Sequence, residues 1–253
     1  VDYLTKVFVP IREFSGKFAS IQRALTALER IFELIDTQEQ ISEGSTTLAM
    51  GEHDLVFEDV SFRYRDHTPY AVKGISFRVN PGEVVALVGE TGSGKTTLGK
   101  LLLRRYEHFE GKILVGGHPI QNLTDISLKR SISMVHQDPY IFDGSIEDNI
   151  RLWSKSVERD ALLRAVQASK IDALLKGSEK TLGYHVTERG RNLSAGERQL
   201  ISIARAFARP SPVVILDEAT ANVDSATEKL IDDALTSLFK QKTMIVIAHR
   251  LST

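Results

Sequence analysis

A glycine-rich run in the first half of the chain has the residue types and the spacing needed to hold a phosphate group. It consists of Gly89, Glu90, Thr91, Gly92, Ser93, Gly94, Lys95, Thr96 and Thr97. Glycines let the backbone fold around an anion with its N–H groups pointing inward, and a helix that starts directly afterwards adds partial positive charge. Lys95 can neutralise β- and γ-phosphates, and the Thr96 hydroxyl can ligate magnesium. The run therefore predicts nucleotide binding, but it does not indicate which reaction follows.

A second stretch ends in two carboxylates. Four apolar residues, Val213–Leu216, run into Asp217 and Glu218. This pattern favours a buried strand that delivers acids at its carboxyl end, where α/β sheets place their ligands. Asp217 can then hold magnesium through water, and Glu218 can polarise an attacking water. A solvated acidic turn would have the same sequence, so the interpretation depends on the neighbouring phosphate-binding run.

The composition excludes several classes of function. A formal net charge of -1 over 253 residues gives no broad positive field that would attract nucleic acid. Cysteine is absent, which excludes disulfides and Cys-ligated zinc and suits a reducing compartment. No signal peptide is visible. The longest apolar runs are far shorter than the roughly 20 residues that a membrane-spanning helix needs; they are Val84–Val88, Val213–Leu216 and Met244–Ala248.

These short apolar runs are instead typical of parallel strands that are buried on both faces. Strands are predicted at Leu55–Phe62, Gly74–Val79, Val84–Gly89, Lys112–Val115, Ser131–Val135, Val213–Asp217 and Thr243–Ala248. Helices are predicted at Gly94–Arg105, Val157–Leu175, Ala195–Ala208 and Ala226–Phe239. This alternation predicts an α/β fold with a mainly parallel sheet, and the helix-rich middle reads as an inserted helical subdomain.

The first part of the chain shows a different pattern. Apolar residues recur there at steps of three and four, which predicts an amphipathic helix over residues 11–36; they are Ile11, Phe14, Phe18, Ile21, Leu25, Leu28, Phe32 and Ile35. The polar stretch Asp36–Thr47 predicts a linker. A coiled-coil or dimer seam would show the same apolar spacing.

A short motif lies between the glycine-rich run and the acidic strand. It consists of Leu193, Ser194, Ala195, Gly196 and Glu197, followed by a predicted helix. In this order, the three motifs together resemble those of the ABC ATPases, whose signature usually reads Leu-Ser-Gly-Gly-Gln. Ala195 and Glu197 depart from that form, but a small residue still allows a phosphate to approach closely. A serine at a helix start can also serve simply as a cap.

The resemblance assigns roles to further residues. Gln137 matches the Q-loop glutamine, which touches magnesium or water and senses the membrane partner. His249 matches the switch histidine that contacts the γ-phosphate, and Asp224 matches the D-loop that crosses the dimer interface. Tyr64 matches the aromatic residue that stacks on adenine, and Tyr70 is a second candidate for that role.

The resemblance also implies a domain organisation. It makes residues 48–253 the ABC ATPase domain, with a phosphate-loop NTPase core, an antiparallel β subdomain and a helical subdomain at about 138–208. Residues 1–47 look like the end of the connection from the last membrane helix of an exporter. Val186–Gly190 resembles the exporter X-loop, although Thr187 stands where that family usually has glycine. The family normally continues with another strand and helices after His249, so we expect the C-terminal end to be truncated.

The mechanism that the resemblance implies needs two domains. They close head to tail around two ATP molecules, so that each site combines the phosphate loop of one domain with the signature of the other. The implied roles are Glu218 as general base, Lys95 and Mg²⁺ as charge stabilisers, and Ser194 as a donor to the partner's ATP. The implied partners are a second ABC ATPase domain, identical or different, and the transmembrane domains of an exporter, without nucleic acid. The implied location is the cytoplasmic face of a membrane, expected to be a bacterial inner membrane.

An ABC-superfamily ATPase that is not coupled to transport remains the alternative. A DNA-maintenance member would place a long coiled coil between the two halves of the site, whereas the interval from Gln137 to Ser194 is short. A translation factor of the superfamily carries paired ATPase domains, whereas one phosphate loop is found here. An importer subunit would lack the N-terminal helix, and a small-molecule kinase would lack the signature. The transported substrate remains open among lipids, drugs and peptides.

Overall fold

The computed structural model describes residues 2–36, 44–49, 51, 53–176, 180–217 and 225–248. Its contacts divide the chain into two units, residues 1–42 and residues 43–253. The division at residues 47 and 48 that the sequence suggests stays a prediction. The helices are α1 (Asp2–Asp36), α2 (Lys95–Leu102), α3 (Asp125–Ser131), α4 (Ile146–Arg151), α5 (Arg159–Ala168), α6 (Ile171–Lys176), α7 (Ala195–Ala208) and α8 (Ser225–Phe239), with short 3-10 turns η1 (Ile120–Asn122) and η2 (Glu188–Gly190). The strands are β1 (Leu55–Phe62), β2 (Val72–Val79), β3 (Val84–Leu87), β4 (Glu110–Val115), β5 (His118–Pro119), β6 (Ile132–Val135), β7 (Gly144–Ser145), β8 (His185–Val186), β9 (Val213–Asp217) and β10 (Thr243–Ile247).

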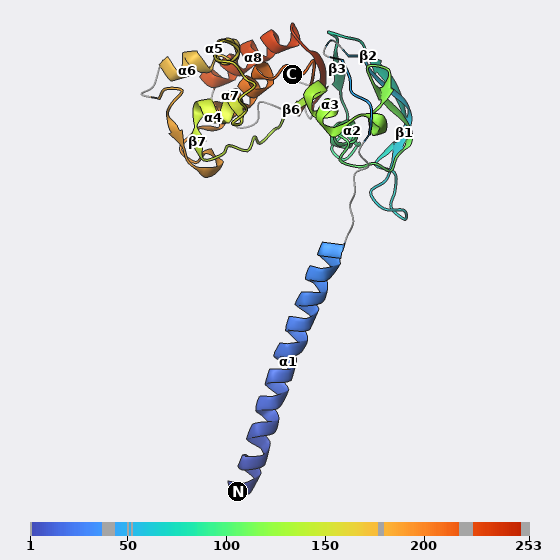
Figure 1. The fold of residues 1–253 in the computed structure, drawn as a ribbon, viewed down its shortest axis with the longest axis vertical. Helices are drawn as coiled ribbons and strands as arrows, with labels where there is room; N and C mark the ends of the chain where they lie inside the picture. The colour runs from blue at the N-terminus through green and yellow to red at the C-terminus, as the bar shows by residue number, and fades with distance from the viewer. Residues whose placement is uncertain are drawn as a thin grey trace. The chain divides into compact units, whose positions relative to one another are not determined.

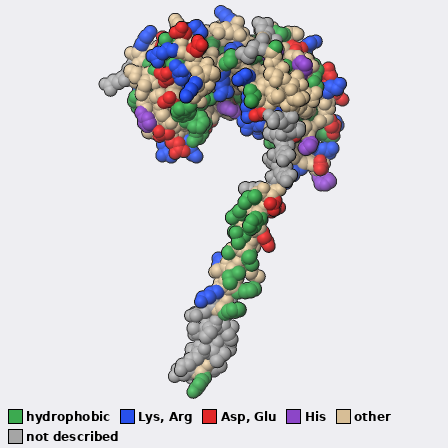
Figure 2. Space-filling model, viewed as in Figure 1, with side chains coloured by type: hydrophobic (Ala, Val, Ile, Leu, Met, Phe, Trp, Pro, Cys, Tyr) green, Lys and Arg blue, Asp and Glu red, His purple; other side chains and the backbone are tan. Residues whose placement is uncertain are grey.

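The first unit is the single long helix α1 (Figure 1). It begins at Asp2, before the apolar spacing that predicted a helix from Ile11. Apolar side chains such as Phe18, Leu25 and Leu28 are exposed along it. Figure 2 shows hydrophobic side chains along this helix. Within the described part of the chain, no helix is both long and apolar enough to cross a membrane.

Two sheets form the framework of the second unit. The antiparallel sheet has the strand order β2-β1-β4-β5, and the parallel sheet has the order β3-β10-β9-β6. A short antiparallel pair joins β7 to β8. The strands predicted at Leu55–Phe62 and Val213–Asp217 have these same bounds in the structure. The predicted α/β fold, with a parallel sheet and an antiparallel one, is confirmed.

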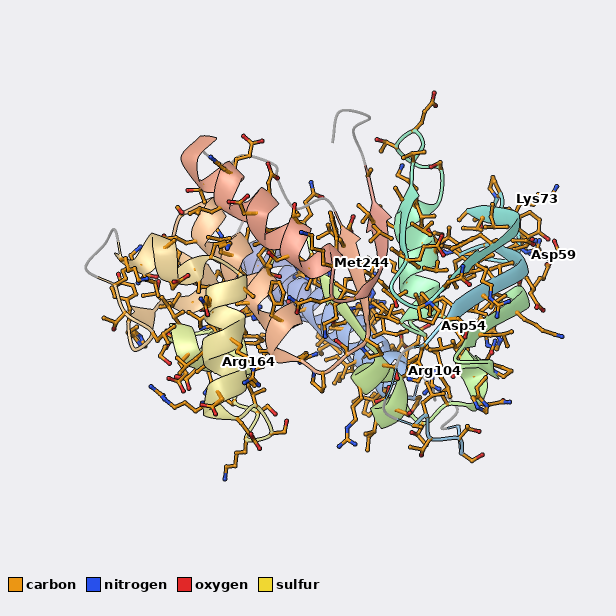
Figure 3. All side chains as sticks on the ribbon, turned by 90° about the horizontal axis from the view of Figure 1, so that it is seen from above. Asp54, Asp59, Lys73, Arg104, Arg164 and Met244 are labelled. Carbon is orange, nitrogen blue, oxygen red and sulfur yellow. The ribbon has the colours of Figure 1, made fainter. Side chains whose placement is uncertain are left out.

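The parallel sheet separates two hydrophobic cores. Alternate side chains of β9 point to opposite faces, so Val213 and Ile215 join the core made with the antiparallel sheet and α2. Val214 and Leu216 instead join the core made with helices α4 to α8. Met244 of β10, labelled in Figure 3, is fully buried in this helical core. Burial on both faces explains the uninterrupted apolar sequences of these central strands.

The helix predicted over Val157–Leu175 is two helices in the structure, α5 and α6. The chain breaks at Lys170, whose φ of 61° lies in the left-handed region. The buried hydroxyl of Ser169 donates to the Val166 carbonyl, and this bond accompanies the end of α5. The break lets α5 and α6 pack separately against α7, a requirement that periodicity alone does not reveal.

The prediction that Val84–Val88 is a buried strand was wrong for its solvent-facing side. Val84 is 40% exposed and Val88 is 60% exposed, whereas Val85 and Leu87 pack against the core. The reason is position, because β3 is the edge strand of the described parallel sheet and pairs there only with β10. An apolar run therefore does not distinguish an edge strand from a central one.

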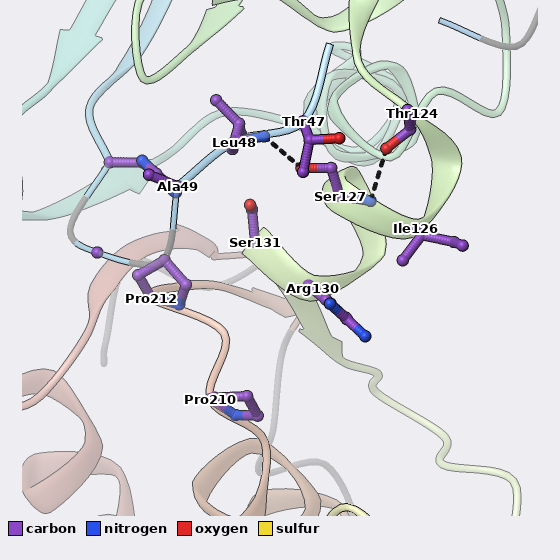
Figure 4. A pocket seen from close by; sticks show the side chains of 12 residues that line it. Thr47, Leu48, Ala49, Thr124, Ile126, Ser127, Arg130, Ser131, Pro210 and Pro212 are labelled. Carbon is purple, nitrogen blue, oxygen red and sulfur yellow. Dashed lines mark hydrogen bonds between the residues drawn. The ribbon is translucent and has the colours of Figure 1, made fainter. Parts of the chain in front are cut away.

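The segment that enters the second unit packs at the amino end of the parallel sheet. Thr46 exchanges backbone hydrogen bonds with Asn122 and Thr124, at 2.8 and 2.9 Å. The Leu48 N–H donates to Ser127 Oγ at 2.7 Å, and the Ser127 N–H donates to the capping hydroxyl of Thr124 (Figure 4). A cavity of about 260 Å³ lies between this segment, α3 and Pro212 before β9. It therefore lies away from the carboxyl ends of the strands, where the candidate site is found.

Candidate functional site

The register of the parallel sheet brings several predicted site residues to the carboxyl ends of neighbouring strands. Leu87 of β3 pairs with Ile247 of β10, and Ile247 pairs with Asp217 of β9. On the far side of β9, Val135 pairs with Leu216. The phosphate loop, Asp217 and the segment of Gln137 therefore all follow the carboxyl ends of neighbouring strands, as expected for ligand sites in α/β sheets. The other three predicted residues, Glu218, Asp224 and His249, lie outside the described residues.

The phosphate loop turns sharply between β3 and α2. Lys95, the first residue of α2, is buried and points its ammonium group back into the loop. The Lys95 Nζ donates to the carbonyl oxygens of Gly89 and Glu90 at 2.6 and 2.8 Å, and it lies 3.4 Å from Ser93 Oγ. The ammonium group of Lys95 is thus held against two backbone carbonyls of the loop, at the N-terminus of a helix, where an anionic group would be favoured.

Glycine is required at position 94. Its φ is 92°, and a Cβ there would lie 2.2 Å from the backbone oxygen of Ala71 and 2.9 Å from the Val72 side chain. Because the nearest obstacle is a backbone atom, it cannot move aside as a flexible side chain could. Gly94 therefore lets the phosphate loop lie directly against the start of β2, a close approach that the sequence motif alone does not explain.

Tyr64 lies beside the phosphate loop. Its hydroxyl is hydrogen-bonded to Thr97 Oγ1 at 2.8 Å, and its ring makes edge contacts with Phe62 and Tyr106. The ring is about half exposed, and it borders a cavity of about 510 Å³ between residues 61–66 and 106–110. An exposed aromatic face next to a phosphate site can stack on a nucleobase.

Tyr70 lines the same cavity but is held differently. Its hydroxyl donates to Glu110 Oε1 at 3.0 Å, and the Arg63 guanidinium lies 5.0 Å from the centre of its ring. The Tyr70 ring is therefore already occupied by a cation, whereas Tyr64 contacts a residue of the phosphate loop. This geometry favours Tyr64 over Tyr70 as the stacking residue.

Oxygen donors and a histidine accompany the loop. Thr96 follows Lys95 on α2, and Asp217 ends β9. The pKa of His136 is lowered from its ordinary value of 6.5, first by loss of hydration and then by the positive charge of Arg105, while the Asp217 carboxylate opposes the shift. The pairing of Val135 with Leu216 places His136 and Asp217 at neighbouring strand ends. The described residues contain no group of three or more His, Asp or Glu side chains arranged to hold a metal ion by themselves.

Gln137 is exposed and begins the segment that leads into the helical core. This segment is held by Asn149, which is fully buried, and by Arg205 of α7. The Arg205 guanidinium donates to the carbonyl oxygens of Tyr140 and Asn149, both at 2.7 Å. Burial, followed by the nearby Arg209 charge, lowers the pKa of Arg205 to about 10. The side chain of Arg205, which projects from α7, therefore positions the backbone that follows Gln137.

The signature residues form the start of α7. Ser194 caps the helix, because its hydroxyl accepts from the Glu197 N–H at 3.1 Å. Glu197 completes a capping box by accepting from the Ser194 N–H at 2.6 Å. Leu193 is buried, whereas Ser194 is exposed and Ala195 partly so. By helix geometry, the N–H groups of Ala195 and Gly196 have no partner inside the helix.

The structure does not bring the signature to the phosphate loop of the same chain. α7 packs with α4, α5, α6 and α8, as Figure 1 shows, whereas α2 belongs to the core of the antiparallel sheet. The side-chain hydrogen bonds of Glu197 join it to Ser194 and Lys180. The segment that resembles the X-loop ends at Gly190, just before the signature. Within this segment, the Arg189 N–H donates to the Ile141 carbonyl.

Several residues at these sites were not predicted from the sequence. Tyr106 flanks Tyr64, Lys180 pairs with Glu197, and Arg205 with Asn149 holds the segment after Gln137. Each belongs to an ordinary polar or aromatic stretch, so neither its type nor its spacing marks it. An acidic residue at the start of a signature helix is the one signal that could have prompted a search for a cation such as Lys180.

Known proteins share both the sequence and the fold. Residues 72–221 match the family model of the ABC transporters. The chain is 40% identical, over its whole length, to a probable multidrug resistance ABC transporter ATP-binding/permease protein of Bacillus subtilis (strain 168), and it covers 37% of that protein. It is also 40% identical over 96% of its length to an ATP-dependent lipid A-core flippase of Cupriavidus metallidurans, of which it covers 42%.

A solved structure gives the same result in three dimensions. A bacterial Atm1-family ABC exporter with ATP bound superposes with a TM-score of 0.78 at 33% identity, covering 99% of this chain and 44% of that one. The chain thus spans less than half the length of these relatives. The family match over residues 72–221 includes the phosphate loop and the signature. The chain therefore belongs to the ABC transporter family and carries its ATP-binding domain.

Proposed function

We propose that this domain hydrolyses ATP with magnesium, between itself and a second ABC ATPase domain, and that hydrolysis drives export across a membrane. The observation that carries the proposal is that the phosphate loop and the signature lie on elements that belong to different cores of the same chain. The phosphate loop and Asp217 follow the carboxyl ends of strands in the parallel sheet, and Tyr64 is hydrogen-bonded to Thr97 beside the loop, while Ser194 starts a helix of the other core. Each half-site presents N–H groups that a bound triphosphate would join, so the two halves are complementary across a head-to-tail dimer.

The proposed reaction is attack of water on the γ-phosphorus. A bond forms between the water oxygen and the γ-phosphorus, while the bond between the γ-phosphorus and the β,γ-bridging oxygen breaks. ADP leaves with the electron pair of the broken bond. Glu218 takes the proton of the attacking water, and Lys95 stabilises the charge that develops on the phosphate oxygens. His249 contacts the γ-phosphate, Gln137 orients water, and Asp224 lies across the dimer interface in this proposal.

The donors at the carboxyl edge suit magnesium. The Thr96 hydroxyl and the Asp217 carboxylate are hard oxygen ligands, with Gln137 as a third candidate, and Mg²⁺ is usually held by one or two protein oxygens together with substrate phosphates. A site without a larger acidic cluster among the described residues fits this mode. When bound, the cation would neutralise charge on the β- and γ-phosphate oxygens.

Coupling to export rests on the relatives. Their names describe ATP-binding/permease proteins and a flippase, and the similar solved structure is that of an exporter. The sequence of α1 resembles the segment that connects the membrane part of an exporter to its ATPase domain. The exposed apolar side chains of α1 suit such a connection. The domain would then act at the cytoplasmic face of a membrane.

The test measures the magnesium-dependent ATPase rate per molecule as a function of protein concentration. We expect the rate to rise with concentration, and we expect Glu218→Gln and Ser194→Ala to abolish it. Ser145→Ala is the matched control, because Ser145 forms the same capping box on α4 and lies outside the proposed site. A rate that is independent of concentration and survives Ser194→Ala would overturn the proposed dimeric site.

A further inference from the structure

The signature of this chain contains a fixed negative charge that is neutralised by a cation from another segment. The Lys180 Nζ lies 2.6 Å from Glu197 Oε1, and the side chains are only 21% and 11% exposed. Lys180 precedes β8, whereas Glu197 belongs to the first turn of α7. The Lys180 ammonium also lies 5.5 Å from the centre of the Tyr184 ring, which further restricts its position.

The same carboxylate is tied to the cap of the signature helix. Its other oxygen, Oε2, accepts from the Ser194 N–H at 2.6 Å, while Ser194 Oγ accepts from the Glu197 N–H. Both oxygens of Glu197 are therefore engaged, one with Ser194 and one with Lys180. Lys180 thereby fixes the rotamer that leaves Glu197 on the backbone of Ser194.

The charge has a consequence for any anion that approaches the start of α7. The helix N-terminus favours a phosphate through its N–H groups and its partial positive charge. A carboxylate on that first turn opposes the same phosphate, because like charges repel strongly where water is partly excluded. Lys180 makes the pair neutral, so the positive potential of the helix end remains available to the ligand.

We propose that Lys180 is a positioning and charge-compensating residue that makes a signature containing Glu197 compatible with the triphosphate of a partner domain. The inference rests on the proposed function, because it needs ATP bound between two domains. It also predicts that the effect of replacing Lys180 depends on residue 197, because Lys180 is needed only while residue 197 is an acid. Glutamine has nearly the same shape as glutamate and no charge, so Glu197→Gln should remove the need for Lys180.

The test is a double-mutant cycle on the full chain. ATP-dependent dimerisation is measured by sedimentation, and binding to the phosphate loop is measured with fluorescent mant-ATP at low protein concentration. We expect Lys180→Met to weaken ATP-dependent dimerisation at least about tenfold, as for a partly buried charge pair at an interface that loses one member. Mant-ATP affinity and the helical circular dichroism should stay unchanged, and Lys180→Arg should restore dimerisation.

The second arm of the cycle repeats the change in the Glu197→Gln background, where Lys180→Met should alter dimerisation by less than about twofold. Lys129→Met is the matched control, because Lys129 also makes a 2.6 Å ion pair, with Asp125, but at an exposed position on α3. That variant should dimerise like the parent chain.

The outcomes separate the inference from the proposed function. If the parent chain does not dimerise with ATP, the proposed function fails, and the inference fails with it. If the parent chain dimerises and Lys180→Met dimerises equally well, the inference alone is wrong. An equal loss in both Glu197 backgrounds, or a loss of mant-ATP binding, would show that Lys180 only stabilises the fold, which also overturns the inference.

Discussion

Asn149 is the most strongly bonded buried amide among the described residues that follow Gln137, and its replacement by alanine should destabilise the domain severely. Its side chain is fully buried. Its Nδ2 donates to the carbonyl oxygens of Phe142 and Ser145, at 2.9 and 3.0 Å. Its Oδ1 accepts from the Phe142 N–H and from Arg205 Nη2, both at 2.9 Å. A single side chain therefore bonds both the turn from Phe142 to Ser145 and the partly buried cation of Arg205.

The magnitude follows from these four bonds. Three of them join neutral groups and are worth about 1 kcal/mol each, and the bond from the Arg205 cation is worth about 1.5–3 kcal/mol. Because bonds that share one side chain are coupled and the site can relax, we expect a loss of about 4 kcal/mol in the free energy of unfolding for Asn149→Ala.

The assay is urea unfolding followed by fluorescence. Trp153 is the only tryptophan of the sequence, and the centre of its ring lies 5.6 Å from the centre of the Phe142 ring. Phe142 belongs to the segment that Asn149 holds. With a urea dependence of about 2–3 kcal/mol per molar, the unfolding midpoint should fall by about 1.3–2 M.

Asn192→Ala is the matched control. Asn192 also makes four hydrogen bonds, to Thr187 N–H and Oγ1, the Tyr184 hydroxyl and the His185 carbonyl, but it is only partly buried. Water can replace these bonds, so we expect a loss of about 1 kcal/mol. If both variants shift the midpoint equally, burial is not what makes the Asn149 bonds strong, and the reasoning is refuted.

Two further predictions concern the site. Tyr64→Phe keeps the aromatic ring but removes the 2.8 Å bond to Thr97, so mant-ATP affinity should weaken about fivefold; an equal effect from Tyr70→Phe would show that the two tyrosines were not distinguished correctly. His136 has a lowered pKa in the folded state, so the unfolded chain takes up its proton first as the pH falls below 6.5. Stability should therefore decrease as the pH falls through that window, and His136→Gln should flatten the dependence measured by urea unfolding at about pH 7.5 and about pH 5.5; an unchanged slope would contradict the assignment.

Local patterns in the sequence were sufficient for the family and for much of the fold. The phosphate loop is recognisable because Gly89–Thr97 must be contiguous to surround one phosphate, and Val213–Leu216 is recognisable because its burial on both faces requires an unbroken apolar run. The predicted bounds of the α7 helix also match the structure, since Ser194 and its capping box mark the start within four residues. The roles predicted for Glu218, Asp224 and His249 stay predictions.

Tertiary structure decided the features that depend on residues far apart in the chain. Position at the sheet edge exposes Val84, although its neighbours in sequence are as apolar as those of a central strand. The bonds from Arg205 to Asn149 and from Lys180 to Glu197 join residues separated by 56 and 17 positions. Periodicity and propensity report only on neighbours within a few residues, because they arise from the geometry of a single helix or strand. The partners that satisfy a buried charge or amide are therefore set by packing, which only the folded chain reveals.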